Sequence, residues 1–412
     1  MDTVYRCCAG LDVHKESVVA CVLWVGEDGS SRKEIRTFAT MTGDLLALSD
    51  WLAERKVTHV AMESTGVFWK PIFNILEGRF EVILVNARHI KQVPGRKTDV
   101  KDCDWIAQLL QHGLLKASFV PERPQRELRD LTRHRAQLVG EHTRVANRIQ
   151  KVLEDANIKL SSVATDVLGV SGRAMIQQLL AGQRDAAQIA DLAHGKLRDK
   201  KAALTAALQG RMTDHHRFML QTLWDHLTYL ESAIASLEQR IEETMRPFGA
   251  HVERLDAIPG VDRTVANALI AEIGVDMSHF PTADHLCSWA GVSPGNNESA
   301  GKRHSGRTTK GNRWLKRCLS QAAWAASHTK DTYLSAQYRH IARRRGRKRA
   351  IIALAHTILI IAYHILADGR QYQELGGDYL DRLHPQRLRE YHVRSLKKLG
   401  YEVKLTGNEH AA

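Results

Sequence analysis

Cysteine is scarce in this chain, with six in 412 residues. No two of them form a C-x-x-C pair, and the 21 histidines add no paired ligand spacing, which argues against a zinc enzyme. Most of the cysteines lie within apolar runs, so we expect buried thiols in a reducing compartment rather than a disulfide framework. The sequence also lacks a P-loop, so ATP is not implied.

Long apolar runs are equally scarce. Residues 350–367 (AIIALAHTILIIAYHILA) contain no Lys, Arg, Asp or Glu and approach the length of a membrane span. The run also contains His356, Thr357, Tyr363 and His364, and a cluster of arginines precedes it. We therefore expect a helix buried in a domain core, and no membrane partner. The first residues show no signal-peptide h-region, so we expect a cytoplasmic protein.

Acidic residues are outnumbered, 46 against 59 Lys and Arg, which gives a net charge of +13. Such an excess indicates a polyanionic partner, and the length allows two to four domains. Residues 297–317 and 339–349 each contain seven Lys or Arg. The candidate nucleic-acid contacts in these two clusters are Lys302, Arg303, Arg307, Lys310, Arg313, Arg343, Arg344, Arg345 and Arg347.

Four acidic residues in the first quarter of the chain form the strongest candidate site. Asp12 lies in an apolar run, Glu63 ends a second one, and Asp99 and Asp102 begin a helical pattern. Carboxylates at i and i+3 share one helix face. Four oxygen donors from three elements suit a hard divalent cation such as Mg²⁺. Two such ions, about 3.5–4 Å apart, clamp the attacking and leaving oxygens of a phosphodiester.

The order of elements around these acids predicts the fold. Three strands are expected first, at residues 5–13, 16–25 and 32–39, with a hairpin turn at 26–30. We then expect helix 44–55, strand 57–63, helix 67–76, strand 81–86 and helix 102–111. This is the order of the RNase H-like fold, a mixed α/β sheet with helices that Holliday-junction resolvases also use. In that fold the acids lie on the first strand, the fourth strand and the last helix.

Each acid alone has a simpler reading. Asp99 fits a helix N-cap, and Glu63 fits an ordinary loop entry. Asp104 lies two residues from Asp102 and so points away from that helix face. The joint placement of the four acids favours a metal site.

The middle of the chain is helical. Residues 122–158 contain an imperfect heptad stripe, and residues 220–241 hold a regular a/d seam of Leu and Ile that Pro247 ends. Two readings stay open, an antiparallel hairpin within one chain and a coiled coil between two chains. The second reading predicts a homo-oligomer.

The C-terminal third combines a turn between helices with a basic loop. Residues 257–270 resemble a helix-hairpin-helix, in which Gly260 lets the backbone approach a DNA phosphate closely. Residues 290–307 are rich in Gly and Ser and then basic, so we expect a loop. Its cations suit phosphate around a serine hydroxyl, although spacing alone favours a loop that touches DNA without chemistry.

Four motifs, in order, carry a family resemblance: Gly10–Lys15 (GLDVHK), Met62–Gly66 (MESTG), Lys97–Asp102 (KTDVKD), and the block from Pro259 to Leu315. Together they resemble the DEDD transposases, the insertion-sequence recombinases that a bridge RNA guides. The resemblance covers most of residues 5–330. It implies three regions: a RuvC-like domain at 1–121, helical coiled-coil segments at 122–250, and an all-α transposase domain at 251–370. A tail at 371–412 follows, outside the resemblance.

The resemblance also implies a chemistry. The family's Mg²⁺-dependent tetrad falls on Asp12, Glu63, Asp99 and Asp102. Its nucleophilic serine, which forms a phosphoserine link to DNA, falls nearest Ser299, although Ala300 stands before the expected glycine, Gly301; Ser293 and Ser305 stay open. Family members bring tetrad and serine together from different protomers of a tetramer, and a non-coding RNA pairs with donor and target DNA. The bacterial cytosol or nucleoid is the expected location.

Three rival functions remain. An RNase H-like, structure-specific nuclease needs only residues 1–120 and gives the serine loop no purpose. A non-enzymatic nucleic-acid-binding protein explains the charge and predicts that the acids are dispensable. A tyrosine recombinase is indicated only by His384, Arg387 and Tyr391, with the tyrosine four residues after the arginine.

Overall fold

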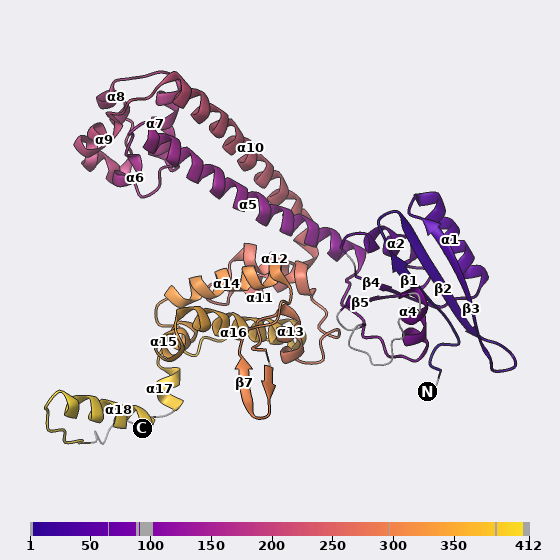
Figure 1. Ribbon diagram of the computed structural model, residues 1–412. Coiled ribbons are helices and arrows are strands. Elements are labelled where there is room, and N and C mark those ends of the chain that lie inside the picture. The colour runs from indigo at the N-terminus through magenta and orange to yellow at the C-terminus, as the bar shows by residue number, and fades with distance from the viewer. Residues whose placement is uncertain are drawn as a thin grey trace. The chain divides into compact units, whose positions relative to one another are not determined.

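The computed structural model divides the chain into two compact units, Met1–Pro121 and Glu122–Ala412 (Figure 1). It describes residues 3–64, 66–87, 90, 102–295, 297–383 and 385–406, and gives only the backbone at 297–299, 303, 304 and 387. Asp99 therefore lies outside the described residues, and the side chains of Ser299 and Arg303 are not described.

A five-stranded mixed sheet forms the centre of the first unit. Its strands are β1 (Cys7–Val13), β2 (Ser17–Val25), β3 (Ser31–Ala39), β4 (His59–Glu63) and β5 (Glu81–Val85), in the spatial order β3-β2-β1-β4-β5. The first three strands are antiparallel neighbours, whereas β4 runs parallel to both β1 and β5. The predicted order of elements is confirmed, with bounds that differ by no more than two residues.

Helices cover both faces of this sheet. On one face, α1 (Thr42–Glu54) and α2 (Trp69–Leu76) pack on a core that includes Leu11 and Met62. On the other face, α4 (Asp102–Gln111) packs on a second core that includes Cys8 and Ala61. Because side chains alternate along a strand, neighbouring residues of β1 serve different cores. This arrangement is consistent with an RNase H-like domain.

The second unit begins with an arm of two long antiparallel helices, α5 (Arg123–Asp155) and α10 (Asp214–Met245), which lie side by side (Figure 1). Leu220, Leu227 and Leu230 of the heptad seam are buried against Val145 and Ile149 of α5. Of the two hypotheses for this seam, the structure therefore supports an antiparallel hairpin within one chain. The seam no longer supports an oligomer.

Short helices close the far end of the arm. They are α6 (Leu160–Val163), α7 (Val170–Leu180), α8 (Ala186–Ala190), the 3₁₀ helix η1 (Gly195–Lys200) and α9 (Lys201–Leu208). Figure 1 shows them grouped where α5 ends and α10 begins.

The rest of the second unit is a helical body with one β-hairpin. Its elements are η2 (Arg246–Phe248), α11 (Gly249–Asp256), α12 (Arg263–Ile273), α13 (Ala283–Ala290), β6 (Asn297–Ser299), β7 (Lys302–Ser305), α14 (Arg313–His328), α15 (Tyr333–Arg345) and α16 (Arg347–Asp368). Helix α16 is long and apolar enough to cross a membrane. In the structure it packs against α11, α13, α14 and α15, with Leu354, Ile358 and Ala362 fully buried. The prediction of a core helix is confirmed.

Two further helices, α17 (Tyr379–Leu383) and α18 (Pro385–Lys398), follow this body. The segment before them contacts the start of α15, where Glu374 accepts hydrogen bonds from the backbone N–H of Tyr333 and of Gly376. Tyr391, the residue of the tyrosine-recombinase reading, is exposed on α18.

Candidate functional site

Asp12 and Glu63 occupy equivalent positions on two neighbouring parallel strands, β1 and β4. Leu11 of β1 pairs with Met62 of β4, and the two acids are the next residue on each strand. Leu11 and Met62 face the core under α1 and α2. By alternation, Asp12 and Glu63 face the side of the sheet that α4 covers.

Gly10 brings the start of α4 to the same place. A Cβ added at Gly10 would lie 2.3 Å from the carbonyl oxygen of Cys103 and 2.4 Å from the amide nitrogen of Ala107, so only glycine permits this contact. Cys8, two residues earlier on β1, contacts the carbonyl oxygen of Ala107. The helix thus runs antiparallel to β1, and its first residue, Asp102, lies toward the Asp12 end of the strand.

The acids supply oxygen donors that suit Mg²⁺, but the side chains of those that the structure describes do not converge on one point. Carboxylate oxygens are the ligands that Mg²⁺ takes in proteins. Within the part of the chain that the structure describes, no group of three or more His, Cys, Asp or Glu side chains converges closely enough to hold an ion. Asp12 instead accepts a hydrogen bond from His14, with 3.2 Å between Oδ2 and Nε2. Sequence reasoning did not single out His14 as a partner of Asp12.

Asp104 has a structural role. The residue is only 4% exposed, and its carboxylate accepts from Lys33 Nζ at 2.6 Å and from Gln108 Nε2 at 2.9 Å. These contacts tie α4 to β3, and the hydrogen bond to Asp104 raises the pKa of Lys33. Asp104 is thus turned toward the β3 side of the unit and is held by a cation of the protein itself.

The serine region is a β-hairpin rather than the predicted loop. Ser299 pairs with Lys302, and Ala300 and Gly301 form the turn between them with φ of 50° and 72°. Two central residues with positive φ define a type I′ turn, whose twist matches the two strands. Ser299 is thus the last residue before the turn, and the exposed Lys302 is the first one after it.

Backbone contacts hold the base of this hairpin. Gly291, which ends α13 in a left-handed conformation, packs directly on Gly311, and a Cβ on Gly311 would lie 2.4 Å from Gly291. Gly295 N–H also donates to the carbonyl oxygen of Arg307. The hairpin extends beyond this base in Figure 1.

The two alternative serines lie away from the turn. The backbone N–H of Ser293 contacts the Cys287 carbonyl at the end of α13. The hydroxyl of Ser305 accepts a hydrogen bond from the N–H of Arg307.

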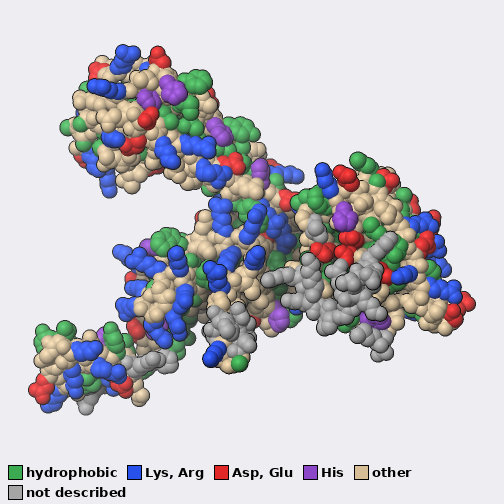
Figure 2. Space-filling view, viewed as in Figure 1, with side chains coloured by type: hydrophobic (Ala, Val, Ile, Leu, Met, Phe, Trp, Pro, Cys, Tyr) green, Lys and Arg blue, Asp and Glu red, His purple; other side chains and the backbone are tan. Residues whose placement is uncertain are grey.

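Eight candidate cations of the two basic clusters have described side chains, and all eight are exposed. Lys302, Arg307 and Lys310 belong to the hairpin and the segment after it, and Arg313 begins α14. Arg343, Arg344, Arg345 and Arg347 surround Gly346, where α15 ends and α16 begins. Within the described ranges, none of these eight residues forms an ion pair with an acid of the chain. Figure 2 shows Lys and Arg side chains gathered over the helical body, whereas Asp and Glu gather on one part of the first unit.

Two family models match the chain. One for DEDD transposases of the IS110 type, described as a transposase, matches residues 9–158. A second, described as the transposase IS116/IS110/IS902 family, matches residues 252–339. The first match contains most of β1 and all of β4 and α4, and the second contains the hairpin and α14. The chain belongs to the DEDD transposase family.

Three curated relatives of the transposase come from insertion elements. An uncharacterized 43.6 kDa protein of IS110 from Streptomyces coelicolor is 27% identical, over 68% of this chain and 73% of its own length. An uncharacterized 44.8 kDa protein of IS116 from Streptomyces clavuligerus is 24% identical, over 85% and 96%. An uncharacterized 42 kDa protein of IS900 from Mycobacterium paratuberculosis is 28% identical, over 67% and 73%.

Gly260 of the transposase has a packing role that the sequence did not predict. With φ of 84°, it lies against the backbone of α14, where a Cβ would come within 2.4 Å of the Ala322 carbonyl oxygen. The start of α12 is capped by the carboxylate of Asp262, which accepts from Val265 N–H at 2.8 Å. The close approach at Gly260 is therefore one between the turn that joins α11 to α12 and helix α14.

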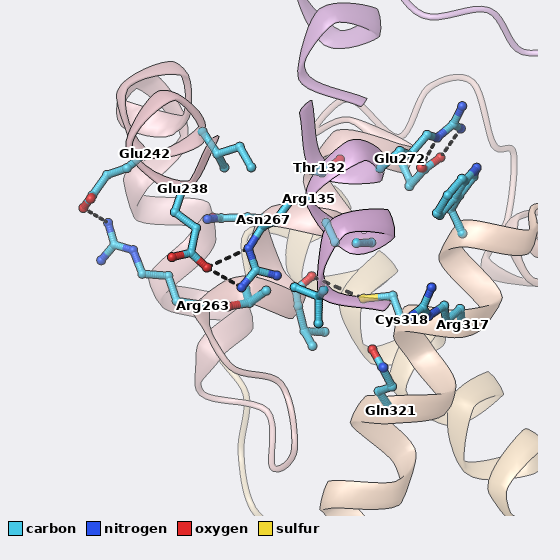
Figure 3. Close-up of a pocket in the computed structure, with 18 residues that line it drawn as sticks. Thr132, Arg135, Glu238, Glu242, Arg263, Asn267, Glu272, Arg317, Cys318 and Gln321 are labelled. Atoms are coloured by element: carbon cyan, nitrogen blue, oxygen red, sulfur yellow. Dashed lines mark hydrogen bonds and ion pairs between the residues drawn. The ribbon is translucent and has the colours of Figure 1, made fainter. Parts of the chain in front are cut away.

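A buried acid holds the hairpin segment and the arm together. Glu272, 2% exposed at the end of α12, accepts two hydrogen bonds from Arg133 of α5, at 2.7 and 2.8 Å (Figure 3). Asn312 donates to the same carboxylate at 2.6 Å, and its own side-chain oxygen caps α14. Arg129 also lies beside it, and burial lowers the pKa of this arginine to about 10. Sequence reasoning missed Glu272 because it lies in an ordinary apolar helical run.

Proposed function

We propose that this transposase cuts and rejoins DNA strands with the carboxylates of Asp12, Glu63, Asp99 and Asp102 and the hydroxyl of Ser299. The observation that carries the proposal is the meeting of β1, β4 and the start of α4 at one end of the sheet, on one face. This placement supports the acids because it puts candidate ligands from separate parts of the sequence within one region.

The donor set suits Mg²⁺. Asp12 and Glu63 lie on a rigid sheet, and Asp102 lies on a helix that Gly10 fixes against it. Carboxylates gathered at one point repel one another unless a cation is bound, so ion binding would draw together the acids that the structure leaves apart. A bound Mg²⁺ would supply stabilisation of negative charge on the scissile phosphate.

Ser299 is the proposed nucleophile. Its oxygen would form the new bond to phosphorus as the bond to one deoxyribose oxygen breaks, and the departing oxygen would leave as a hydroxyl. The hairpin geometry supports this role because Ser299 directly precedes an exposed type I′ turn and pairs with the exposed Lys302. A serine hydroxyl is a weak nucleophile at neutral pH and needs activation by a nearby base or a metal ion.

The remaining parts of the proposal concern partners. The exposed cations Lys302, Arg307, Lys310 and Arg313, together with Arg303 and the corner at Arg343–Arg347, would bind donor and target DNA and a non-coding guide RNA. The acids and the serine belong to different units, so a site assembled from different protomers, in a dimer or a tetramer on nucleic acid, remains part of the proposal. The four regions 1–121, 122–250, 251–370 and 371–412 and a cytosolic location also belong to it.

The test is recombination between donor and target sites, with the non-coding DNA that flanks the gene supplied on a plasmid. Asp12→Asn and Asp102→Asn should each lower recombination by about a thousandfold, because several kcal/mol of transition-state stabilisation are lost. Asp44→Asn, an equal charge change at an exposed residue of α1 on the opposite face of the sheet, should leave recombination unchanged. Full activity of Asp12→Asn with an unchanged melting temperature would refute the metal site.

A further inference from the structure

The second unit contains a cavity of about 370 Å³ where the base of the arm meets α12 and α14 (Figure 3). Its walls come from α5, α10, α12 and α14, and apolar side chains such as Val139, Ile241 and Ala268 form part of them. A concave, partly apolar site of this size suits a ligand as large as one nucleotide.

The arginines that line the cavity outnumber its glutamates by one. Three of its four arginines are paired with glutamates: Arg133 with Glu272, Arg135 with Glu238, and Arg263 with Glu242. The fourth, Arg317, is exposed and forms no ion pair with any described residue. The cavity therefore carries an excess of one positive charge, which favours a ligand with an anionic group.

The cavity also contains a buried polar atom that lacks a partner. Asn267 lines it from α12, and its Oδ1 is buried without a hydrogen bond in the described part of the chain. An unsatisfied buried acceptor costs about 1–3 kcal/mol, and a ligand donor would remove that cost. An amide side chain has the hydrogen-bonding pattern that reads the edge of a nucleobase. Figure 3 shows Asn267, Arg317 and Gln321 around the same space.

The outer face of α14 continues from the cavity. Arg313, Arg317 and Trp324 lie on one side of this helix, since their spacing of four and seven residues matches its turns. Trp324 is 53% exposed and contacts the ring of His328. Cations and an exposed aromatic ring along one track suit the phosphates and bases of an unpaired strand.

We propose that this cavity binds one unpaired nucleotide, with its phosphate at Arg317 and the edge of its base at Asn267. The inference rests on the proposed function, because strand cleavage and rejoining expose unpaired nucleotides. The ligand chemistry is a nucleoside monophosphate, and the track along α14 favours a nucleotide within a strand over a free one.

The test is binding without catalysis. Full-length protein in EDTA is titrated with a fluorescein-labelled DNA duplex that has one unpaired adenosine, and with the same duplex fully paired. We expect about tenfold tighter binding of the bulged duplex. Asn267→Leu and Arg317→Gln should each bring the two affinities within twofold of each other. Lys151→Gln, an equal charge change at an exposed residue of α5 outside the cavity, should keep the tenfold preference.

Asn267→Leu also separates binding from folding. Since it removes an unsatisfied buried acceptor, its melting temperature should stay the same or rise. A titration with AMP distinguishes the two sources of the ligand: binding of AMP that Asn267→Leu abolishes, without a preference for the bulge, supports a site for a free nucleotide. Equal affinity for both duplexes with no AMP binding would overturn the proposal, as would a preference that both cavity variants retain. Asp12→Asn should keep the preference, so failure of the acidic site leaves this result unaffected.

Discussion

At the scale of single residues, the candidate acidic site depends on a residue without a side chain. Gly10 lies between Cys8 and Asp12 on the face of β1 that α4 covers, and the contact at Cys103 fixes how near the helix comes. Protein interiors tolerate little extra volume, and one added methyl group must move a neighbour. Here the neighbour is the helix backbone that begins with Asp102.

Gly10→Ala should therefore move α4 away from the sheet. We expect the free energy of unfolding to fall by about 1–3 kcal/mol, the usual effect of overpacking, and recombination to fall with it because Asp102 moves. Thermal unfolding and the recombination assay measure the two effects. Gly43→Ala is the control, since a Cβ on this glycine of α1 meets nothing within 4 Å. A Gly10→Ala protein with unchanged stability and recombination would contradict the packing argument.

At the scale of elements, the β6–β7 hairpin places Ser299 by means of a strained turn. Ala300 adopts φ of 50°, a conformation that costs a non-glycine residue about 1–2 kcal/mol. A turn of this type usually has Gly, Asn or Asp at this position. Strain at such a position is a recurrent property of functional sites.

The turn can be tested with two substitutions at one residue. Ala300→Gly removes the strain and should preserve recombination. Ala300→Val adds a β-branched side chain that disfavours positive φ, so the hairpin should open and recombination should fall at least about tenfold, the equivalent of 1.4 kcal/mol. Limited proteolysis of the turn reports the opening independently. Equal recombination in the two variants would show that the turn does not position the serine.

The elements also show how much the sequence could predict. Strands β1 to β5 and helix α4 were predictable because apolar runs and turn residues mark them directly. The hairpin at 297–305 was not, because its Gly- and Ser-rich composition hides a two-residue turn that contains Ala300. The heptad pattern of α10 shows that one face of the helix is apolar, but it does not show which helix packs on that face. In the structure this helix is α5 of the same chain. Glu272 and Asn267 were missed because only three-dimensional packing reveals a buried polar group.

At the scale of the whole molecule, charge decides the class of partner. The net charge of +13 is distributed unevenly, with described cations exposed on the hairpin, on α14 and at the corner between α15 and α16. Cations of this kind bind phosphates by releasing counterions, so affinity depends on salt. Buried thiols add no competing chemistry, since burial raises the pKa of Cys8, Cys21, Cys287 and Cys318 to about 12.

The affinity for duplex DNA should therefore fall steeply with salt. We expect the logarithm of the association constant to fall by about 0.9 per phosphate neutralised, against the logarithm of salt concentration. Replacement of Arg343, Arg344 and Arg345 by Gln should flatten that slope by up to about 3. Lys151 of the arm, with Arg184 and Lys196 at the far end of the arm, is exposed. Replacement of these three cations by Gln provides a control with the same charge change and should leave the slope unaltered. A wild-type slope near zero would rule out this mode of binding.

The most direct test of the account is to trap the covalent link between protein and DNA. A nicked donor duplex that loses its short cleaved fragment prevents rejoining, so the protein should remain attached to the DNA. Mass spectrometry of the attached peptide should place the DNA on Ser299, and Ser299→Ala should give no adduct while it still binds DNA. An adduct on Ser293, Ser305 or Tyr391 would contradict the assignment of the nucleophile. Strand cleavage without any adduct would instead show direct hydrolysis at the acidic site and refute the serine mechanism.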